Sequence, residues 1–197
     1  IRNHGNLSIR EADALDFGQL TTNCDSVSTA FLSISHAANI TFPDPFPLPA
    51  NCTLNLDVPL SPTGDWTIPS GSALSHNKNY DSEDYKLELT LTGNLTVEEG
   101  GKIDTDGKGY ACNQGPGCSG SYNGGSHGGK GADYAGNGDI GPTYGSVTAP
   151  ITMGSSGCNG SWGGGAVIIS ASGTVTVRGT ISANGFYGGY GGAAAGC

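Results

Sequence analysis

Four segments of the chain alternate apolar and polar residues with the period of two that is typical of a half-buried β-strand. They are FLSIS at 31–35, LNLDV at 54–58, LELTL at 87–91 and VIIS at 167–170. Side chains of a strand point alternately to its two faces, so such a segment presents one apolar face to a core. The pattern therefore predicts four short strands, each covering part of a hydrophobic interior.

A shorter motif follows each of these segments and consists of a small residue, a polar residue and then apolar-Thr-apolar. Its copies are ANITF at 38–42, GDWTI at 64–68, GNLTV at 93–97 and GTVTV at 173–177, so their starts lie 26, 29 and 80 residues apart. A unit that recurs every few tens of residues is typical of a solenoid, in which each turn covers the open core of its neighbour. We expect an all-β fold, a single-stranded β-helix or β-solenoid. A β-sandwich also suits short alternating strands and is the alternative.

Glycine divides the chain unevenly, because only five of the 35 glycines precede residue 100. The long third interval of the repeat contains most of the remainder. We expect one continuous domain in four parts. These are an N-terminal arm or cap at 1–25, the first coils at 26–106, an ordered glycine-rich excursion at 107–162, and the last coil with a glycine-rich C-terminal segment at 163–197.

The segment SIREADALDFG at 8–18 is the one place where a helix is indicated. Ser8 and Glu11 have the spacing of a capping box, and Gly18 is a suitable helix stop. A short helix that caps the end of the solenoid and an extended arm both agree with this pattern.

The charge balance excludes some partners. The chain has 17 acidic and 8 basic residues and a net charge of −9, whereas nucleic acids and anionic membrane surfaces require clusters of Lys and Arg. No apolar run approaches the ~20 residues of a membrane span. The chain begins with Ile1 rather than Met, and we interpret it as a mature or excised segment of a longer protein.

Cysteines and glycosylation sequons together indicate a secreted glycoprotein. N-glycosylation is predicted at Asn6, Asn39, Asn51, Asn94 and Asn159. The six cysteines match no zinc-site spacing, and an even number favours three disulfides. We expect Cys112–Cys118 as a local bond, Cys24–Cys52 as the next, and Cys158–Cys197 by elimination.

The parity of the repeat also predicts where two of the glycans lie. In NIT and NLT the Asn and the Thr are two residues apart, so both point away from the buried residue between them. Glycans on Asn39 and Asn94 would then stack along one side of the solenoid, at equivalent corners.

The central glycine run GGSHGGKGADYAG allows several chemical interpretations. A phosphate loop needs Ser or Thr after Lys130, and Gly131 stands there. The segment 128–135 approximates a calcium-binding nonapeptide, but such sites need tandem copies. Asp104, Asp106 and Asp133 are therefore weak calcium candidates, and we expect no dedicated metal site and no cofactor beyond N-linked glycans.

Many β-helices act on polysaccharides, so the carboxylates of this chain are candidates for catalysis. Glycoside hydrolysis needs two carboxyls facing one sugar bond, and Asp104 and Asp106 can share a face, with Asp133 or Asp139 near them. Lyase chemistry needs an Arg or Lys base among acids, and Lys108 is the nearby candidate. We interpret these groups as solvated turn residues and His127 as a hydrogen-bonding loop residue. Several aromatic residues lie among the glycines, namely Tyr110, Tyr122, Tyr134, Tyr144, Trp162, Tyr187 and Tyr190. They could stack on sugars, but we favour their covering bare glycine backbone.

From residue 93 onward the sequence resembles a family of glycine-rich extracellular proteins of plants, algae and other eukaryotes, with bacterial relatives. The motifs are GKGY at 107–110, GPG at 115–117, SHGGKG at 126–131, YGSVTAP at 144–150, GSSG at 154–157, GGGAVIISASGTVTV at 163–177 and GTISANG at 179–185. The resemblance implies a right-handed β-helix surface protein. Some relatives resemble components of algal flagellar hairs (mastigonemes), which are extracellular filaments. The cysteines at 112, 118, 158 and 197 depart from the commoner cysteine-free form.

These observations together predict a non-enzymatic, extracellular, N-glycosylated structural protein that polymerises with copies of itself into a filament or a surface layer. A solenoid end leaves strands and core uncovered, and stacking of protomers would cover them. A carbohydrate-binding adhesin is the alternative function, and a polysaccharide lyase or hydrolase is a third class that the sequence favours less.

Overall fold

The structure is a computed structural model. It describes residues 48–119, 123–134, 136–146, 148–157 and 160–187 in full, and the backbone of six short strands within residues 1–47. This described part contains strands and loops and no helix, which confirms the all-β class. The chain divides into two compact units. We call them the strand unit (Ile1–Asn77, Leu87–Asp104 and Ile168–Ile181) and the loop unit (Lys78–Lys86, Thr105–Val167 and Ser182–Cys197).

The largest sheet of the strand unit has six strands in the order β15-β12-β9-β7-β5-β2. Their bounds are β2 Leu7–Ala12, β5 Ala30–Ala37, β7 Cys52–Leu56, β9 Ala73–Ser75, β12 Lys102–Asp104 and β15 Thr180–Ser182. The registered pairs are parallel and align one apolar position per strand, because Leu54 pairs with both Leu32 and Leu74, and Leu74 pairs with Ile103. Leu54, Leu74 and Ile103 are at most 2% exposed, so this row lies in the core.

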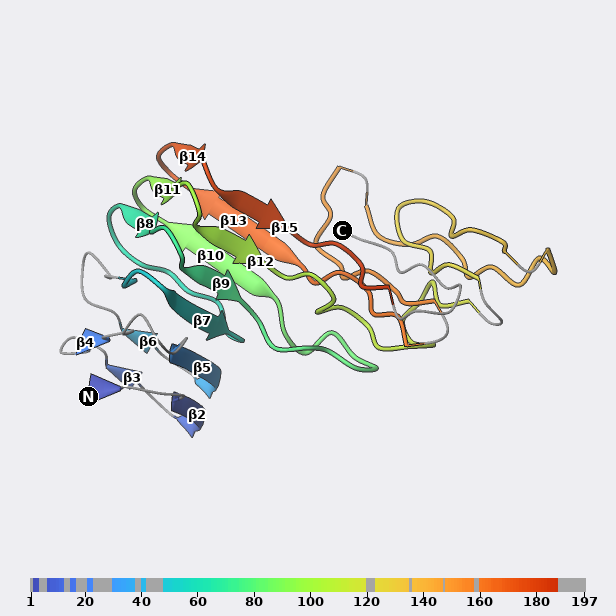
Figure 1. Cartoon of the computed structure of the whole chain (residues 1–197), viewed down its shortest axis with the longest axis horizontal. Coiled ribbons are helices and arrows are strands. Elements are labelled where there is room, and N and C mark those ends of the chain that lie inside the picture. Colours follow the sequence, from blue (N-terminus) through green and yellow to red (C-terminus); the bar gives the residue numbers. More distant parts are fainter. Residues whose placement is uncertain are drawn as a thin grey trace. The chain divides into compact units, whose positions relative to one another are not determined.

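Two further sheets contain three of the four corner motifs and the last two alternating segments. The three-stranded sheet has the order β14-β11-β8, and the two-stranded sheet joins β10 to β13. Their bounds are β8 Trp66–Ile68, β10 Leu87–Leu91, β11 Leu95–Val97, β13 Val167–Ala171 and β14 Val175–Val177. Leu95 pairs in parallel with Trp66 on one side and with Val175 on the other. Figure 1 shows these strands as stacked layers.

Two small sheets complete the N-terminal part. They join β1 (Arg2–Asn3) to β4 (Thr21–Thr22) and β3 (Leu15–Asp16) to β6 (Ile40–Thr41), both in parallel. The helix alternative for 8–18 is wrong, because the backbone there forms β2 and β3. Pairing of β2 with the alternating strand β5 outweighs the capping-box signal, since a cap supplies only ~1 kcal/mol.

The four predicted alternating segments and the four corners all contain strands, but they are not four copies of one unit. The corners β8, β11 and β14 share one sheet, as predicted. The first corner, β6, pairs with β3 instead. The alternating strands β5 and β7 lie in the six-stranded sheet and not beside β10 and β13. On the side of β10 away from β13, Leu60 forms an isolated parallel bridge with Leu89 of β10.

The parallel pairings do not suit the sandwich alternative, since that architecture is built from antiparallel sheets. No sheet closes on itself among the described strands. Tight corners join the strands, and glycine occupies positions with positive φ at Gly64 (77°), Gly71 (75°) and Gly100 (80°). Other residues are strained in this left-handed region, so these glycines fix where the chain turns.

The loop unit is held by backbone lying against backbone. Gly109 N donates to Gly163 O at 2.7 Å, and Gly154 N donates to Gly164 O at 2.9 Å. A Cβ added to Gly163 would lie 1.6 Å from Gly154 O. Side chains are therefore excluded where these segments meet, which explains why glycine is concentrated there.

Candidate functional site

The last turn of the strand unit, β13 to β15, has apolar side chains that remain exposed. Val175, Val177 and Ile181 are 43%, 46% and 38% exposed. Val175 and Val177 pair in register with Leu95 and Val97, which are 0% exposed. The same inward positions are thus buried one turn earlier and exposed here. We call Val175, Val177 and Ile181 the terminal face.

The position of Ile181 follows from the backbone ladder. Thr180 N donates to Gly101 O at 3.1 Å, which in a parallel pair places Ile181 alongside Ile103. Ile103 is 0% exposed, as a residue covered by a following turn should be. Exposure of all three residues therefore has a common cause, which is that none of the described strands covers this end.

The strand edges at the terminal face are unpaired on one side. β13, β14 and β15 each end the strand order of their sheet, with a neighbour on only one side among the described strands. Figure 1 shows them together in orange and red at one end of the stacked layers. An exposed edge of a parallel sheet offers backbone donors and acceptors to another strand. This combination of apolar side chains and open edges makes the terminal face the candidate assembly surface.

A polar ladder runs along the corners next to these strands. Asp65 Oδ1 accepts hydrogen bonds from Asn94 N (2.8 Å) and Asn94 Nδ2 (2.9 Å), and Asn94 Oδ1 accepts one from Thr174 N (2.8 Å). The hydrogen bonds from the backbone and side chain of Asn94 lower the pKa of Asp65. Two hydrogen bonds therefore link the corner at Asp65 to the corner at Asn94, and one links the corner at Asn94 to the corner at Thr174.

Two of the predicted glycosylation sites lie within the described residues, and both are exposed. Asn94 projects from the corner before β11, and the predicted glycan on its Nδ2 would leave one N–H to donate to Asp65. Asn51 has a left-handed φ of 60° just before β7. The predicted sites Asn6, Asn39 and Asn159 lie outside the described residues.

The predicted stack of glycans at equivalent corners is not supported by the strand order. Asn39 precedes β6, which pairs with β3, whereas Asn94 precedes β11 in the sheet with β8 and β14. The residue that corresponds to Asn94 one turn earlier is Asp65, and one turn later it is Thr174. The polar ladder therefore takes the place of a row of sequons.

The predicted disulfide between Cys112 and Cys118 does not form in the structure. Cys112 and Cys118 are both free thiols, so the structure does not contain the Cys112–Cys118 disulfide. Cys112 Sγ instead accepts a hydrogen bond from Gly160 N at 3.1 Å, and the next residue, Asn113, donates its N–H to Gly157 O at 3.1 Å. Cys112 thus faces a different segment of the loop unit.

The other cysteine predictions are only partly covered by the described residues. Cys52 is disulfide-bonded. The predicted partners and pairs that involve Cys24, Cys158 and Cys197 lie outside the described residues.

Two of the three weak calcium candidates accept hydrogen bonds within loops, and the third ends a strand. Asp106 accepts hydrogen bonds from Asn184 N (2.6 Å) and Asn184 Nδ2 (3.3 Å). Asp133 accepts from Asn137 N (3.2 Å) and Gly138 N (3.0 Å). Asp104 lies at the end of β12 with its side chain half-buried. Among the described residues no group of three or more His, Cys, Asp or Glu side chains could hold a metal ion.

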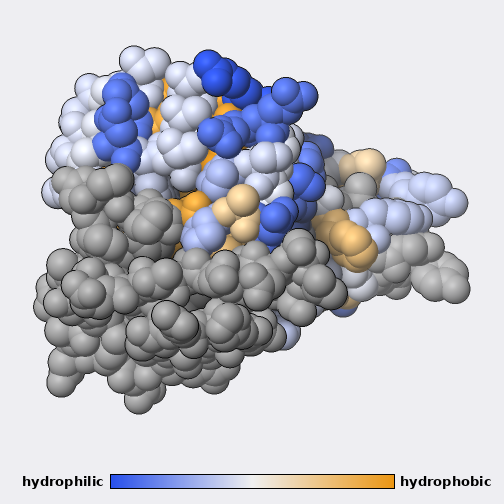
Figure 2. Space-filling model, turned by 60° about the vertical axis from the view of Figure 1, so that its left-hand side comes forward, coloured by the Kyte–Doolittle hydropathy of each residue, from blue (hydrophilic) through white to orange (hydrophobic). Residues whose placement is uncertain are grey.

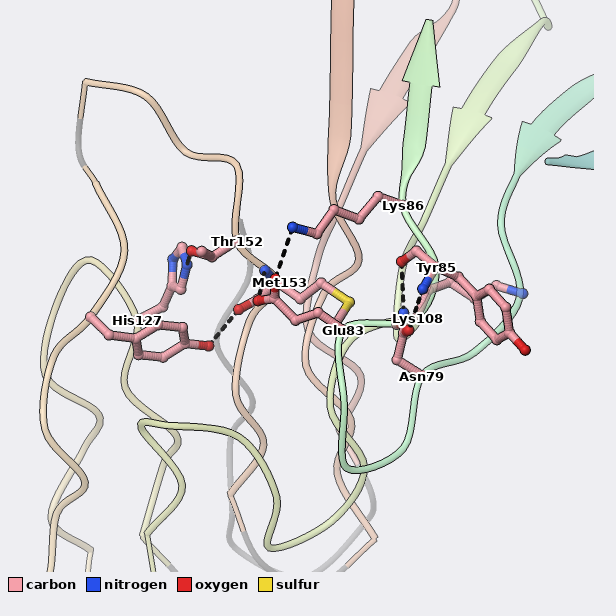
Figure 3. A network of polar contacts seen from close by, with 9 residues as sticks. Asn79, Glu83, Tyr85, Lys86, Lys108, His127, Thr152 and Met153 are labelled. Carbon is pink, nitrogen blue, oxygen red and sulfur yellow. Dashed lines mark hydrogen bonds and ion pairs between the residues drawn. The ribbon is translucent and has the colours of Figure 1, made fainter. Parts of the chain in front are cut away.

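The loop unit contains a polar network around Glu83, which Figure 3 shows. Glu83 Oε2 forms an ion pair with Lys86 Nζ at 2.8 Å, and Glu83 Oε1 accepts a hydrogen bond from Met153 N at 3.2 Å. Tyr110 and Met153 are buried together. Burial, and then the negative charge of Glu83, raise the pKa of Tyr110 to about 12. The phenol therefore stays protonated, and Glu83 joins three segments of the unit.

His127, in the middle of the glycine run, is part of the same unit and is buried. Its Nε2 lies 2.8 Å from Thr152 Oγ1, and its ring packs edge-on against Tyr144 with centroids 4.7 Å apart. Burial lowers the pKa of His127, and the charge of Glu83 opposes that shift. The Tyr144 hydroxyl donates to Met153 O. His127 is a hydrogen-bonding loop residue, as predicted.

Asn79 is a structural residue that the sequence did not reveal. It is 0% exposed. Its Nδ2 donates to Tyr85 O and to Lys108 O, both at 2.9 Å, and its Oδ1 accepts from Tyr85 N at 2.8 Å. This side chain closes the loop 79–85 (Figure 3). In the sequence, the mostly polar segment between β9 and β10 indicates a loop, but it does not indicate that Asn79 is the residue that holds the loop together.

Comparisons with known protein families, with curated proteins and with solved structures found no match. Within the described residues no helix is long and apolar enough to cross a membrane. The site is therefore interpreted from its own geometry.

Proposed function

We propose that this chain is a non-enzymatic, secreted, N-glycosylated structural protein whose strand units assemble end to end into an extracellular filament or surface layer. The observation that carries the proposal is the terminal face. Val177 is 46% exposed, while Val97, its partner in register, is 0% exposed. A protein that ended its stack at this turn would leave part of a core exposed to water.

The proposal includes a right-handed β-solenoid as the architecture of the strand unit. The chain visits the same three sheets in the same order twice, first through β10, β11 and β12 and then through β13, β14 and β15. β11 lies in parallel register on β8, β12 on β9, and β14 on β11. This order is what a coiled chain of stacked turns produces. The handedness rests on the resemblance to glycine-rich extracellular β-helix proteins.

The strand order also supplies a partner for the terminal face. β15 and β2 stand at opposite ends of the six-stranded sheet. Contact between the last turn of one copy and the first turn of the next would extend that parallel sheet. Such a head-to-tail contact uses two different surfaces and does not close on itself, so repetition produces a filament.

The size of the terminal face limits the strength of one such contact. Complete burial of a Val or Ile side chain contributes about 1.5–3 kcal/mol, and these side chains are already half covered. The three together therefore contribute a few kcal/mol, against an association cost of about 4 kcal/mol or more. Backbone hydrogen bonds between the open strand edges therefore have to contribute to the free energy of association as well. We expect assembly to depend strongly on protein concentration.

Secretion and glycosylation rest on separate observations. The five sequons, the exposed side chains of Asn51 and Asn94, and the disulfide-bonded Cys52 support an oxidising, extracellular location. Figure 2 shows a face on which the described residues present mostly hydrophilic surface, with small apolar areas between them. A surface of this kind suits a protein exposed to water along its sides.

The test is assembly of the purified chain in a concentration series, followed by sedimentation velocity and negative-stain electron microscopy. We expect filaments or sheets for the native chain and loss of assembly for Val175→Lys/Val177→Lys. Thr176→Lys is the matched control, because Thr176 lies between the two valines and points to the opposite face of β14. A native chain that stays monomeric at every concentration would contradict assembly. Filaments that persist in the double variant would exclude the terminal face.

A further inference from the structure

A second group of exposed apolar side chains lies in the loop unit and consists of aromatic rings. Tyr80 is 63% exposed and Phe186 is 58% exposed, and Trp162 between them is half-buried. We call Lys78, Tyr80, Trp162 and Phe186 the aromatic cluster. Aromatic rings that merely covered glycine backbone would be buried, as Tyr110 is at 7% exposure.

The backbone fixes Trp162 and Phe186 side by side. They form an antiparallel bridge in which Trp162 N donates to Phe186 O at 3.0 Å and Phe186 N donates to Trp162 O at 2.7 Å. Residues that exchange both hydrogen bonds in this way point their side chains to the same side. A Cβ added to Gly107 would lie 2.8 Å from Phe186 Cβ and 3.9 Å from Trp162 Cβ. Both side chains therefore leave the backbone over Gly107.

The segment 78–80 adds two side chains to this pair. The ring of Tyr80 meets that of Trp162 edge-on, with centroids 5.3 Å apart and planes at 75°. Lys78 Nζ lies 4.4 Å from the centre of the Trp162 ring. These contacts hold the indole in place, while Tyr80 and Phe186 keep more than half of their surface open to solvent.

We propose that the aromatic cluster is a binding site for a neutral polysaccharide. A pyranose ring has an apolar face of C–H groups and a rim of hydroxyls, so it fits a site with open aromatic rings and polar groups around them. Asp106 and Asn184 are exposed and bonded to each other, one residue before Gly107 and two before Phe186. They supply acceptors and donors for hydroxyl groups next to the rings.

The local charge favours a neutral polymer over an acidic one. The exposed carboxylates Asp81 and Asp84 belong to the same loop as Tyr80, and the whole chain carries a net charge of −9. Lys78 is the cation of the cluster, and its ammonium group lies over the Trp162 ring. A polymer of uronic acids would meet net repulsion here, whereas uncharged hexoses would not.

Binding is tested with the full chain and soluble neutral polysaccharides of several linkages, namely glucans, mannans and galactans, with alginate as the acidic comparison. The readouts are retardation in native gels containing each polymer and the emission of tryptophan. The chain has two tryptophans, and Trp66 is 1% exposed, so a change in emission or in quenching by acrylamide reports Trp162. We expect retardation by at least one neutral polymer, together with reduced quenching.

Tyr80→Ala and Phe186→Ala are expected to weaken binding by about three- to tenfold each, which is the range of one aromatic contact. Tyr134→Ala is the matched control, because Tyr134 belongs to the same unit, is 76% exposed and lies outside the cluster. It should bind like the native chain. Three results would overturn the proposal: no retardation by any neutral polymer, equal loss in the control, or preference for alginate. A lowered melting temperature of both cluster variants without any polysaccharide binding would show that the rings only pack within the chain.

Discussion

The strand unit and the loop unit are stabilised in opposite ways. In the strand unit, rows of Leu, Ile and Val pack in register, as at Leu54 and Leu74, and glycine is used at the corners. In the loop unit, glycines bring backbone segments together, and buried polar side chains such as Asn79 and Ser126 join them. The difference shows that one chain can form a core from side chains in one part and from backbone hydrogen bonds in another.

The largest effect is expected where the backbones of the loop unit touch. Gly163→Ala would place a Cβ 1.6 Å from Gly154 O, so two segments would have to separate and lose their hydrogen bonds. We expect a loss of about 3 kcal/mol or more in the free energy of unfolding. Gly128→Ala is the control, since a Cβ there meets nothing within 4 Å, and it should change stability by less than about 1 kcal/mol. Urea unfolding measures both; equal effects would contradict backbone packing as the basis of this unit.

A smaller effect is expected where a matched pair of valines distinguishes the interior of the strand unit from its end. Val97 and Val177 pair in register, but one is 0% and the other 46% exposed. Val97→Ala leaves a cavity and should lower the free energy of unfolding by about 2 kcal/mol, whereas Val177→Ala should lower it by less than about 1 kcal/mol. Urea unfolding is to be measured at low protein concentration, where assembly does not contribute. A Val177→Ala cost as large as that of Val97→Ala would mean that the terminal face is covered within one chain.

The smallest effect is a pH dependence confined to the loop unit. Burial lowers the pKa of His127 in the folded chain below its usual value of 6.5. The unfolded state then binds the proton more readily, so the stabilisation is present above about pH 6.5 and is lost as the pH falls through the lower pKa. The negative charge of Glu83 and the hydrogen bond with Thr152 oppose this lowering of the pKa. Amide hydrogen exchange between pH 7 and pH 5 should show faster opening of the loop unit.

His127→Gln is the control for this pH dependence, because it retains a hydrogen-bonding side chain without a titrating ring. The variant should lose the difference between pH 7 and pH 5 in the loop unit. Exchange that accelerates equally in the strand unit, or equally in the variant, would mean that another group is responsible.

Some features of the fold were predicted from the sequence because they depend on neighbouring residues. The period of two in LELTL predicted β10, and glycine with a following apolar-Thr-apolar motif predicted β11 and β14. His127 was also predicted as a loop residue with hydrogen-bonding contacts. In these cases the residues themselves contain the information, since period and turn propensity are local properties.

Other features could not be predicted because they depend on residues far apart in the chain. Ser8 and Glu11 suggest a helix cap locally, but pairing with β5 makes the segment a strand. Asn55 lies at a polar position of an alternating segment, yet it is 1% exposed because Asn77 covers it and accepts a hydrogen bond from its Nδ2 at 3.1 Å. Spacing alone suggested a bond between Cys112 and Cys118, whereas the fold turns Cys112 toward Gly160.

The sequence by itself determined that the chain forms short strands with glycine corners and that its second half is rich in close backbone contacts. Alternation decides which face of a strand is apolar, and a residue without Cβ decides where backbones can meet. Only the tertiary structure decided which strands share a sheet, which aromatic rings stay open, and that Val97 is buried while Val177 is not. These outcomes depend on which other residues cover each position. Residues of neighbouring turns that contact one another lie 20 to 80 positions apart along the chain.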